Sequence, residues 1–345
     1  VRLDSRNEPI ETYTNDDVTG LARVFTGWSW AGPDKSDTRF FGGNADTDRA
    51  VRPMQPYPKF HSTSEKRFLG VVVPAQGTAD AEASLRIALD RLYSHPNVGP
   101  FIGKQLIQRL VTSNPTPGYV ARVAAAFNDN GAGARGDMKA VIRAVLLDPE
   151  ARNPAAGSTD YGKLREPVVR VAHWLRAFGA RSASGRFLIG NSENPNTSLG
   201  QAPMRSPSVF NFYRPGYVPP NTAIATAGLV APEMQITHES SVAGYLNTMR
   251  SAIGGGVGSG SPRDVQPDYG EVIGLADRPD ALVDRLGMLL AAGDLSPELR
   301  AQLIDAVGSV AVSTTNAQSA ATARLNRVKL AIFLIMASPD YLVQK

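Results

Sequence analysis

The residues best suited to acid–base chemistry are a histidine and a lysine that lie five positions apart, His61 and Lys66. A loop histidine titrates near neutral pH and a lysine adds a positive charge, so the pair could transfer protons or bind an anion. The alternative is that both residues fix the loop together with Glu65. Glu166 could supply a catalytic carboxylate to His61, although its position before Pro167 also suits the start of a helix.

A second group of chemically useful residues lies in the segment MRSPSVFNFYRP, residues 204–215. Arginine binds carboxylate, sulfate or phosphate through two parallel hydrogen bonds, and aromatic rings beside it could stack on a sugar. We therefore expect a ligand site formed by Arg205, Asn211, Tyr213 and Arg214. The alternative is that the arginines bond backbone carbonyls while Phe210 and Phe212 anchor the loop in the core.

Metal-binding patterns are weak. Asn44, Asp46 and Asp48 alternate like the start of a calcium loop, but Arg49 replaces the expected glycine and Gln55 replaces the closing glutamate. A solvated turn is the alternative. Cysteine is absent, and the four histidines lack the spacing of a metal centre. We expect no metal other than this weak calcium candidate.

Several functional classes lack their signatures. A G-x-S-x-G motif is missing, which disfavours an α/β-hydrolase. The glycine run 254–260 has no phosphate-binding lysine, so no cofactor is expected. The net charge is only +4 and the arginines are scattered, which does not indicate nucleic-acid binding. The apolar run 330–337 is too short to span a membrane.

The elements that must position these residues are mainly helices. Apolar residues recur at helical spacing in six segments. These segments are 85–92, 120–127, 138–146, 168–175, 299–307 and 325–335. Pro167 and Ser296 mark two helix starts, and Ser94-His95-Pro96 marks a helix end.

The expected fold is all-α, with a small β element near residues 38–73 and long ordered loops. Residues 68–73 end in three β-branched valines and could form a strand, with a partner at 38–41. We expect a main domain over residues 1–253, with loops at 29–66 and 179–232. Residues 254–262 (GGGVGSGSP) predict a flexible linker, followed by a helical section over 263–345 that packs on the main domain.

Several segments together resemble the bacterial DUF1800 family, a family without an established reaction. They are ETYTNDDVTGLARVFTGW, YPKFHSTSEKRFLG, LYSHPNVGPFIGKQLIQRLV, KLREPVVRVAHWLRAFG, LGQAPMRSPSVFNFYRPGYVPP and SPDYLVQK. His61 and Lys66 match a His and a Lys that family members often carry. Members usually have a further helical region before the Thr-Gly-Trp segment, so the resemblance implies the C-terminal portion of a longer precursor. It also implies an exported, periplasmic or extracellular protein with a sulfatase-like partner.

Three functions fit these observations. The first is a binding or assembly component that recognises an acidic or carbohydrate ligand, or a partner protein, through residues 199–220. The second is an extracytoplasmic hydrolase that uses His61 with a carboxylate. The third is a structural component of a surface assembly. The first is preferred, because the loop carries arginines and aromatics whereas no nucleophile–base set is identifiable.

Overall fold

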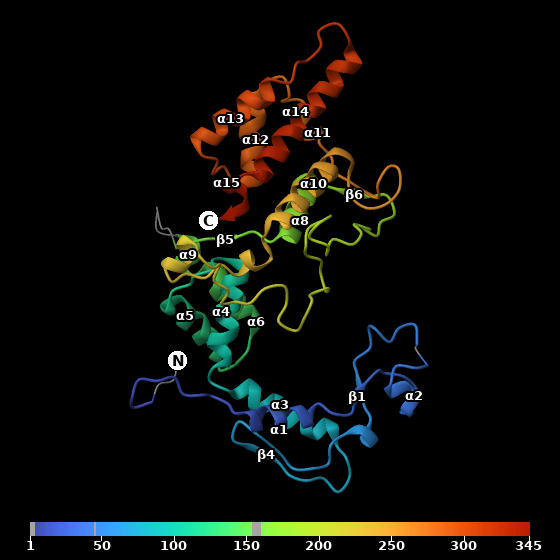
Figure 1. Ribbon diagram of the computed structural model, residues 1–345, viewed down its shortest axis with the longest axis vertical. Helices are drawn as coiled ribbons and strands as arrows, with labels where there is room; N and C mark the ends of the chain where they lie inside the picture. Colours follow the sequence, from blue (N-terminus) through green and yellow to red (C-terminus); the bar gives the residue numbers. More distant parts are fainter. Residues whose placement is uncertain (1–3, 45, 154–159) are drawn as a thin grey trace. The chain divides into compact units, whose positions relative to one another are not determined.

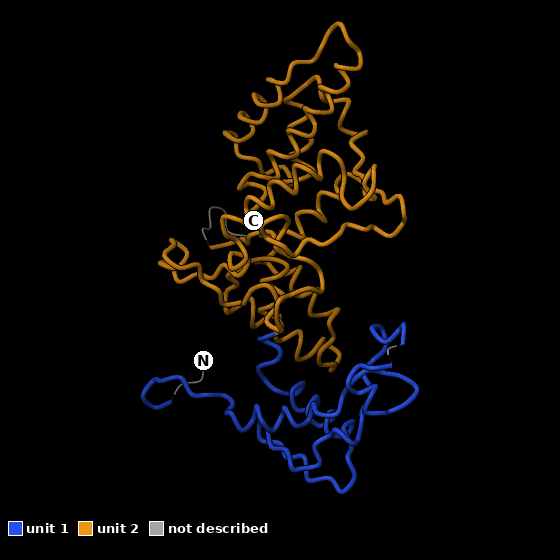
Figure 2. The backbone as a smooth tube through the Cα atoms, turned by 45° about the vertical axis from the view of Figure 1, so that its right-hand side comes forward, with its two compact units in different colours: residues 1–101 blue, residues 102–345 orange. Residues whose placement is uncertain are grey.

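A computed structural model describes residues 4–44, 46–153 and 160–345. The chain is mainly helical, as the apolar spacing predicts, and its strands form only short antiparallel pairs in the described ranges (Figure 1). It divides into two compact units, residues 1–101 and 102–345, with the boundary inside α4 (Val98–Leu110) (Figure 2). Each unit is described by itself.

Unit 1 is a small helical unit with two short hairpins. Its apolar core contains Val24, Phe68, Val73 and Ala88. The elements before α4 are α1 (Asn15–Val24), β1 (Trp28–Ser29), α2 (Asp37–Phe40), β2 (Gln55–Pro56), a 3₁₀ turn (Pro58–Phe60), β3 (Lys66–Phe68), β4 (Val71–Val73) and α3 (Ala81–Ser94).

The strand expected at 68–73 is instead a two-stranded hairpin, β3 and β4, and its expected partner at 38–41 was wrong. Leu69 and Gly70 both have positive φ, 46° and 75°. Two such residues form the tight turn whose twist matches an antiparallel pair. Residues 37–40 form helix α2, with the Ser36 side chain accepting from the backbone N–H of Arg39.

Unit 2 begins with a helical group that leads to the residues of interest. These elements are α5 (Pro117–Asn128), α6 (Met138–Leu147), α7 (Pro149–Arg152), β5 (Lys163–Leu164), α8 (Pro167–Ala177), β6 (Arg181–Ser182), α9 (Ala223–Thr226) and a 3₁₀ turn (Pro232–Ile236). The second half contains α10 (Glu239–Gly255), β7 (Val265–Gln266), α11 (Gly270–Ile273), α12 (Pro279–Ala291), α13 (Pro297–Gly308), α14 (Ala317–Ala337), α15 (Pro339–Leu342) and β8 (Val343–Gln344).

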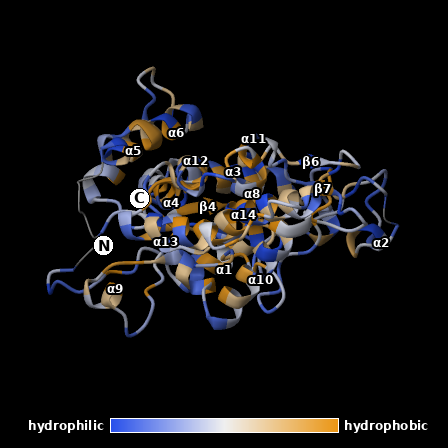
Figure 3. Cartoon of the chain, turned by 90° about the horizontal axis from the view of Figure 1, so that it is seen from above, coloured by the Kyte–Doolittle hydropathy of each residue, from blue (hydrophilic) through white to orange (hydrophobic). Residues whose placement is uncertain are grey.

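One apolar core joins both halves of unit 2. Trp174 on α8 and Met249 on α10 share it with Leu286 on α12 and Ile332 on α14. Polar and apolar segments are mixed along the chain (Figure 3). The buried residues of α14 gather in its second half, at Val328, Ile332 and Ile335, as expected for a helix that is apolar there. Within the described ranges, none of the helices combines the length and the hydropathy that a bilayer span requires.

The glycine segment expected to be a linker has a defined conformation. Helix α10 extends through Gly255, and Val257 exchanges two backbone hydrogen bonds with Val265, at 2.9 and 3.0 Å. Val265 is fully buried. The two valines close the glycine turn, and the chain's compact units divide near residue 101 rather than here.

Candidate functional site

Four residues from distant parts of unit 2 meet in one polar cluster. Arg109 lies in the last turn of α4 and its Nη1 is 3.0 Å from Glu166 Oε1. The same Nη1 contacts the hydroxyl of Tyr213, and the guanidinium lies over the Tyr213 ring at 4.1 Å. Gln201 donates to the other oxygen of Glu166 at 2.5 Å. We name Arg109, Glu166, Gln201 and Tyr213 the Arg109 cluster.

The start of α8 fixes Glu166 in this cluster. Glu166 is the N-cap residue and Pro167 follows at the first helical position, where its missing N–H costs nothing. The carboxylate of Glu166 makes no capping hydrogen bond. Gln201 instead accepts from the backbone N–H of Val168 at 3.2 Å. Gln201 therefore caps the helix and leaves Glu166 to bind Arg109.

A buried ion pair contacts the backbone of Arg109, a member of the cluster. Lys163 Nζ lies 3.3 Å from Glu233 Oε1, and both side chains are almost completely buried. Lys163 is held in β5 by pairing with β8, and its ammonium also donates to the carbonyl of Arg109 at 2.7 Å. Ser113 donates to Glu233 at 3.4 Å. This pair ties the end of α4 to the segment around residue 233.

A small cavity beside the cluster contains an unsatisfied acceptor. Gln108 is 4% exposed, and its amide N–H groups donate to the carbonyls of Ser113 and Pro215. This orientation leaves Gln108 Oε1 without a partner among the residues described. The cavity measures about 10 Å³ and is also lined by Arg109, Tyr213 and Glu233. Such a volume admits about one water-sized group.

Only one nitrogen of the Arg109 guanidinium forms hydrogen bonds within the described residues. Its contacts with Glu166 and Tyr213 all involve Nη1, whereas Nε and Nη2 have no partner within residues 4–44, 46–153 and 160–345. About one third of the side chain is exposed. Gln105, one turn earlier on α4, also lines the cavity. The free Nε–Nη2 edge is the geometry that binds two oxygen atoms in parallel.

Burial and charge fix the protonation of the cluster. Burial, together with the neighbouring Glu166 carboxylate, raises the pKa of Tyr213 well above its usual range, so its hydroxyl stays protonated. Burial alone would raise the pKa of Glu166, but hydrogen bonds from Tyr213 and Gln201 and the charge of Arg109 lower it below its usual value. At neutral pH the cluster therefore contains a carboxylate, a guanidinium and a phenol.

Comparison with known proteins identifies the family. A family model described as "Protein of unknown function (DUF1800)" matches residues 6–343, nearly the whole chain. The chain belongs to the DUF1800 family. No curated protein and no solved structure matches it.

Of the four residues expected to bind ligand in this DUF1800 chain, Tyr213 alone is in the Arg109 cluster. Arg205 is exposed and pairs with Glu193, whose Oε2 lies 2.6 Å from Nε. Asn211 is exposed in a left-handed turn at φ 68°. The guanidinium of Arg214 lies 5.7 Å from the ring of Phe210, which is itself exposed. Tyr213, rather than Phe210, anchors this segment.

His61 and Lys66 of the DUF1800 chain are buried in unit 1. His61 Nδ1 lies 2.9 Å from the Thr26 carbonyl, and Nε2 lies 3.1 Å from Ser84 Oγ. Both ring nitrogens therefore have partners, and His61 joins the end of α1 to α3. Lys66 is fully buried and donates to the carbonyl of Ser64 at 3.2 Å. Glu65 pairs with Arg67 rather than with either residue.

Lys66→Met is expected to stabilise unit 1 by about 1–2 kcal/mol at pH 7, because the ammonium has no ion-pair partner within the described ranges. Burial and the charge of Arg23 lower the pKa of Lys66. The folded state therefore binds fewer protons than the unfolded state, and wild-type stability rises toward pH 10.5. The difference in the free energy of unfolding between Lys66→Met and the wild type should therefore become smaller as the pH rises toward 10.5. Urea denaturation measures it, with the exposed Lys59→Met as control. Loss of stability in Lys66→Met would contradict the prediction.

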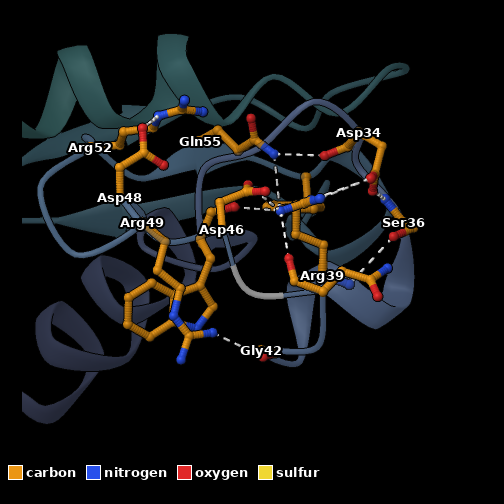
Figure 4. Close-up of polar contacts among 12 residues, drawn as sticks. Asp34, Ser36, Arg39, Gly42, Asp46, Asp48, Arg49, Arg52 and Gln55 are labelled. Carbon is orange, nitrogen blue, oxygen red and sulfur yellow. Dashed lines mark hydrogen bonds and ion pairs between the residues drawn. The ribbon is translucent and has the colours of Figure 1, made fainter.

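The residues considered for calcium belong to an arginine network in unit 1 (Figure 4). Arg39 is buried and lies 3.2 Å from Asp34 and 2.8 Å from Asp46. It also donates to the Asn44 carbonyl at 3.0 Å, while Asp48 pairs with Arg52. Arginine side chains thus form ion pairs with both carboxylates of the calcium-like pattern, Asp46 and Asp48. The described ranges contain no group of three His, Asp or Glu side chains placed to hold a metal ion.

Asp34 is expected to titrate near pH 2. Hydrogen bonds from Ser36, with a further contribution from Arg39, lower its pKa to about 2. A lowered carboxyl pKa stabilises the fold fully above the unfolded value near 4, and this contribution is lost as the pH falls toward 2. A carbon-detected NMR titration should give a midpoint near 2. In Asp34→Asn the free energy of unfolding should fall less than in the wild type as the pH is lowered from about 4 to 2. A midpoint near 3.8 would contradict this account.

Sequence reasoning missed several residues of the site. Arg109, Gln105 and Gln108 lie on α4 within KQLIQRL, where the pattern indicates an ordinary amphipathic helix. Lys163 lies in the short strand β5 and Glu233 in the 3₁₀ turn 232–236, and neither position matches a recognisable sequence motif. The one available signal is the density of polar residues on the apolar face of α4, where Gln108 follows the buried Ile107.

Proposed function

We propose that this DUF1800 protein is an exported binding protein that recognises a hydroxylated acid, such as a sugar acid, at the Arg109 cluster. The proposal is supported by the free Nε–Nη2 edge of Arg109 and the unpartnered oxygen of Gln108, since both residues line the same small cavity. The Arg109 edge would bind two carboxylate oxygens in parallel. A ligand hydroxyl placed in the cavity would donate to Gln108 Oε1.

The charge balance favours a singly charged or neutral ligand. Arg109 and Lys163 are matched by Glu166 and Glu233. A phosphate or another dianion would face two carboxylates as well as two cations, whereas one carboxylate with neighbouring hydroxyls adds a single charge. Tyr213 contributes a fixed wall, since one face of its ring is covered by Arg109.

Isothermal titration with galacturonate, glucuronate, glucose and acetate tests the proposal. A uronate should bind more tightly than both glucose and acetate, because only the uronate satisfies the arginine edge and the amide oxygen together. Arg109→Lys should weaken uronate binding about tenfold or more by removing the planar edge. Gln105→Ala, which leaves the ion pairs intact, should also weaken it.

The matched control is Arg300→Lys, the same change in an exposed ion pair with Asp284. It should bind like the wild type. Thermal melts of each variant show whether the fold is intact. Absence of saturable uronate binding, or equal affinity in wild type, Arg109→Lys and Gln105→Ala, would reject the proposal.

A second candidate function is recognition of a partner protein. Met204, Val209 and Phe210 are highly exposed on one loop segment, which is typical of an interaction site. By family resemblance the partner would be an exported sulfatase-like protein. Replacement of all three residues by serine should abolish binding to such a partner in biolayer interferometry. Unchanged affinity would exclude this surface.

A further inference from the structure

A second cavity lies at the C-terminal end of α10 and shares no residue with the Arg109 cluster. Its volume is about 350 Å³, within the range of small-molecule sites. Its apolar lining comes from α10, α11, α14 and the turn before α11. These residues are Ile253, Pro267, Tyr269, Ile273 and Leu325.

One cation, Lys329, lines this cavity together with the polar residue Gln266 and four glycines. Lys329 of α14 donates to the carbonyl of Gly254 at 2.7 Å. An ammonium has three N–H groups, so two remain for other acceptors. Lys329 has no carboxylate partner in the described part of the chain. The nearby Arg263 has none there either, and it donates to Ser251 and to the carbonyl of Gly256. Arg263 does not line the cavity, so the ammonium of Lys329 is the one full charge among the lining residues. The cavity therefore favours a negatively charged group.

The glycines at the cavity wall are not all required by the chain itself. Gly256 has φ 81°, and a Cβ there would lie 2.2 Å from Gln266, so glycine is needed. Gly254 and Gly255 lie within α10, and a Cβ at either position would meet no atom within 4 Å. Glycine in a helix costs about 0.5–1 kcal/mol relative to alanine. What these two glycines provide is open space in the cavity.

We propose that this cavity binds a small amphipathic carboxylate. The carboxylate accepts hydrogen bonds from Lys329, and the apolar body lies along Ile253, Ile273 and Leu325. The open wall at Gly254 and Gly255 gives the ligand its room. This site is independent of the proposed sugar-acid site, because the two cavities have no lining residue in common.

Titration with octanoate, octanol and hexanoate, followed by calorimetry, tests the proposal. Octanoate should bind saturably and more tightly than hexanoate. Lys329→Met should weaken octanoate at least about tenfold, because a charge-assisted hydrogen bond is lost, and should leave octanol unchanged. Gly255→Leu should fill the cavity and weaken both ligands, while its thermal stability stays equal to the wild type or rises.

Gly274→Leu is the matched control. Gly274 also has open space around it but does not line the cavity. This variant should bind octanoate like the wild type. No saturable binding of octanoate, or unchanged affinity in Gly255→Leu, would overturn the proposal. Equal loss of octanol and octanoate in Lys329→Met would overturn the role of the charge.

Discussion

Lys163→Met is expected to lower the free energy of unfolding of unit 2 by about 3–5 kcal/mol, because it leaves a buried carboxylate without its counter-charge. Glu233 is 2% exposed and its other hydrogen bond, from Ser113, is long at 3.4 Å. The lost ammonium also leaves the carbonyl of Arg109 without its donor. The end of α4 and the segment that carries Glu233 should loosen together.

Urea denaturation followed by tryptophan fluorescence measures this loss. Arg300→Met is the control, since it breaks an exposed ion pair and should cost less than about 1 kcal/mol. The double variant Lys163→Met, Glu233→Leu should recover much of the stability, because no buried charge remains. A single variant within about 1 kcal/mol of wild type would show that Glu233 is not buried as a carboxylate.

Gly244→Ala is expected to destabilise unit 2 by about 3 kcal/mol through overpacking. A Cβ at Gly244 would lie 2.3 Å from the carbonyl oxygen of Pro195 and 2.7 Å from that of Ser198. Both are backbone atoms, which cannot turn aside as a side chain can. Residues 195–198 would have to move away from α10 to make room for the methyl group. These residues directly precede Leu199 and Gln201 in the chain. We therefore expect the hydrogen bond between Gln201 and Glu166 to weaken as well.

The control is Gly216→Ala, in the same long segment, where a Cβ would meet no atom within 4 Å. It should change stability by less than about 0.5 kcal/mol. Denaturation curves compare the two variants, and uronate titration of Gly244→Ala reports on the Arg109 cluster. Equal stability of both alanine variants would contradict the close approach of α10 to residues 195–198.

The helices could be predicted because their signals are local. Asp137 caps α6 and Ser296 caps α13 through their side chains, and Pro167 begins α8. The helical spacing of apolar residues did not reveal which of these residues are buried. On α6, Val141 is buried, whereas Met138 and Ile142 are about 40% exposed. The reason is that α6 packs mainly on α5, so only a narrow face is covered.

The site could not be predicted because its contacts are distant in sequence. Arg109 meets a carboxylate 57 positions away and a phenol 104 positions away. Neither partner changes the local pattern of apolar residues around α4. The sequence did indicate Glu166 and Tyr213 as candidates, from a helix start and an aromatic loop. What it lacked was the pairing, since hydrogen bonds between side chains leave no periodic trace.

The most direct measurement is the NMR signal of the Arg109 Nε–Hε group during titration with galacturonate. We expect a saturable shift of this signal, with the same dissociation constant as calorimetry gives, because Nε–H is half of the free edge. The Nε–Hε signal of Arg205, already bonded to Glu193, should stay in place. An Arg109 signal that does not move while galacturonate binds would contradict the proposed site.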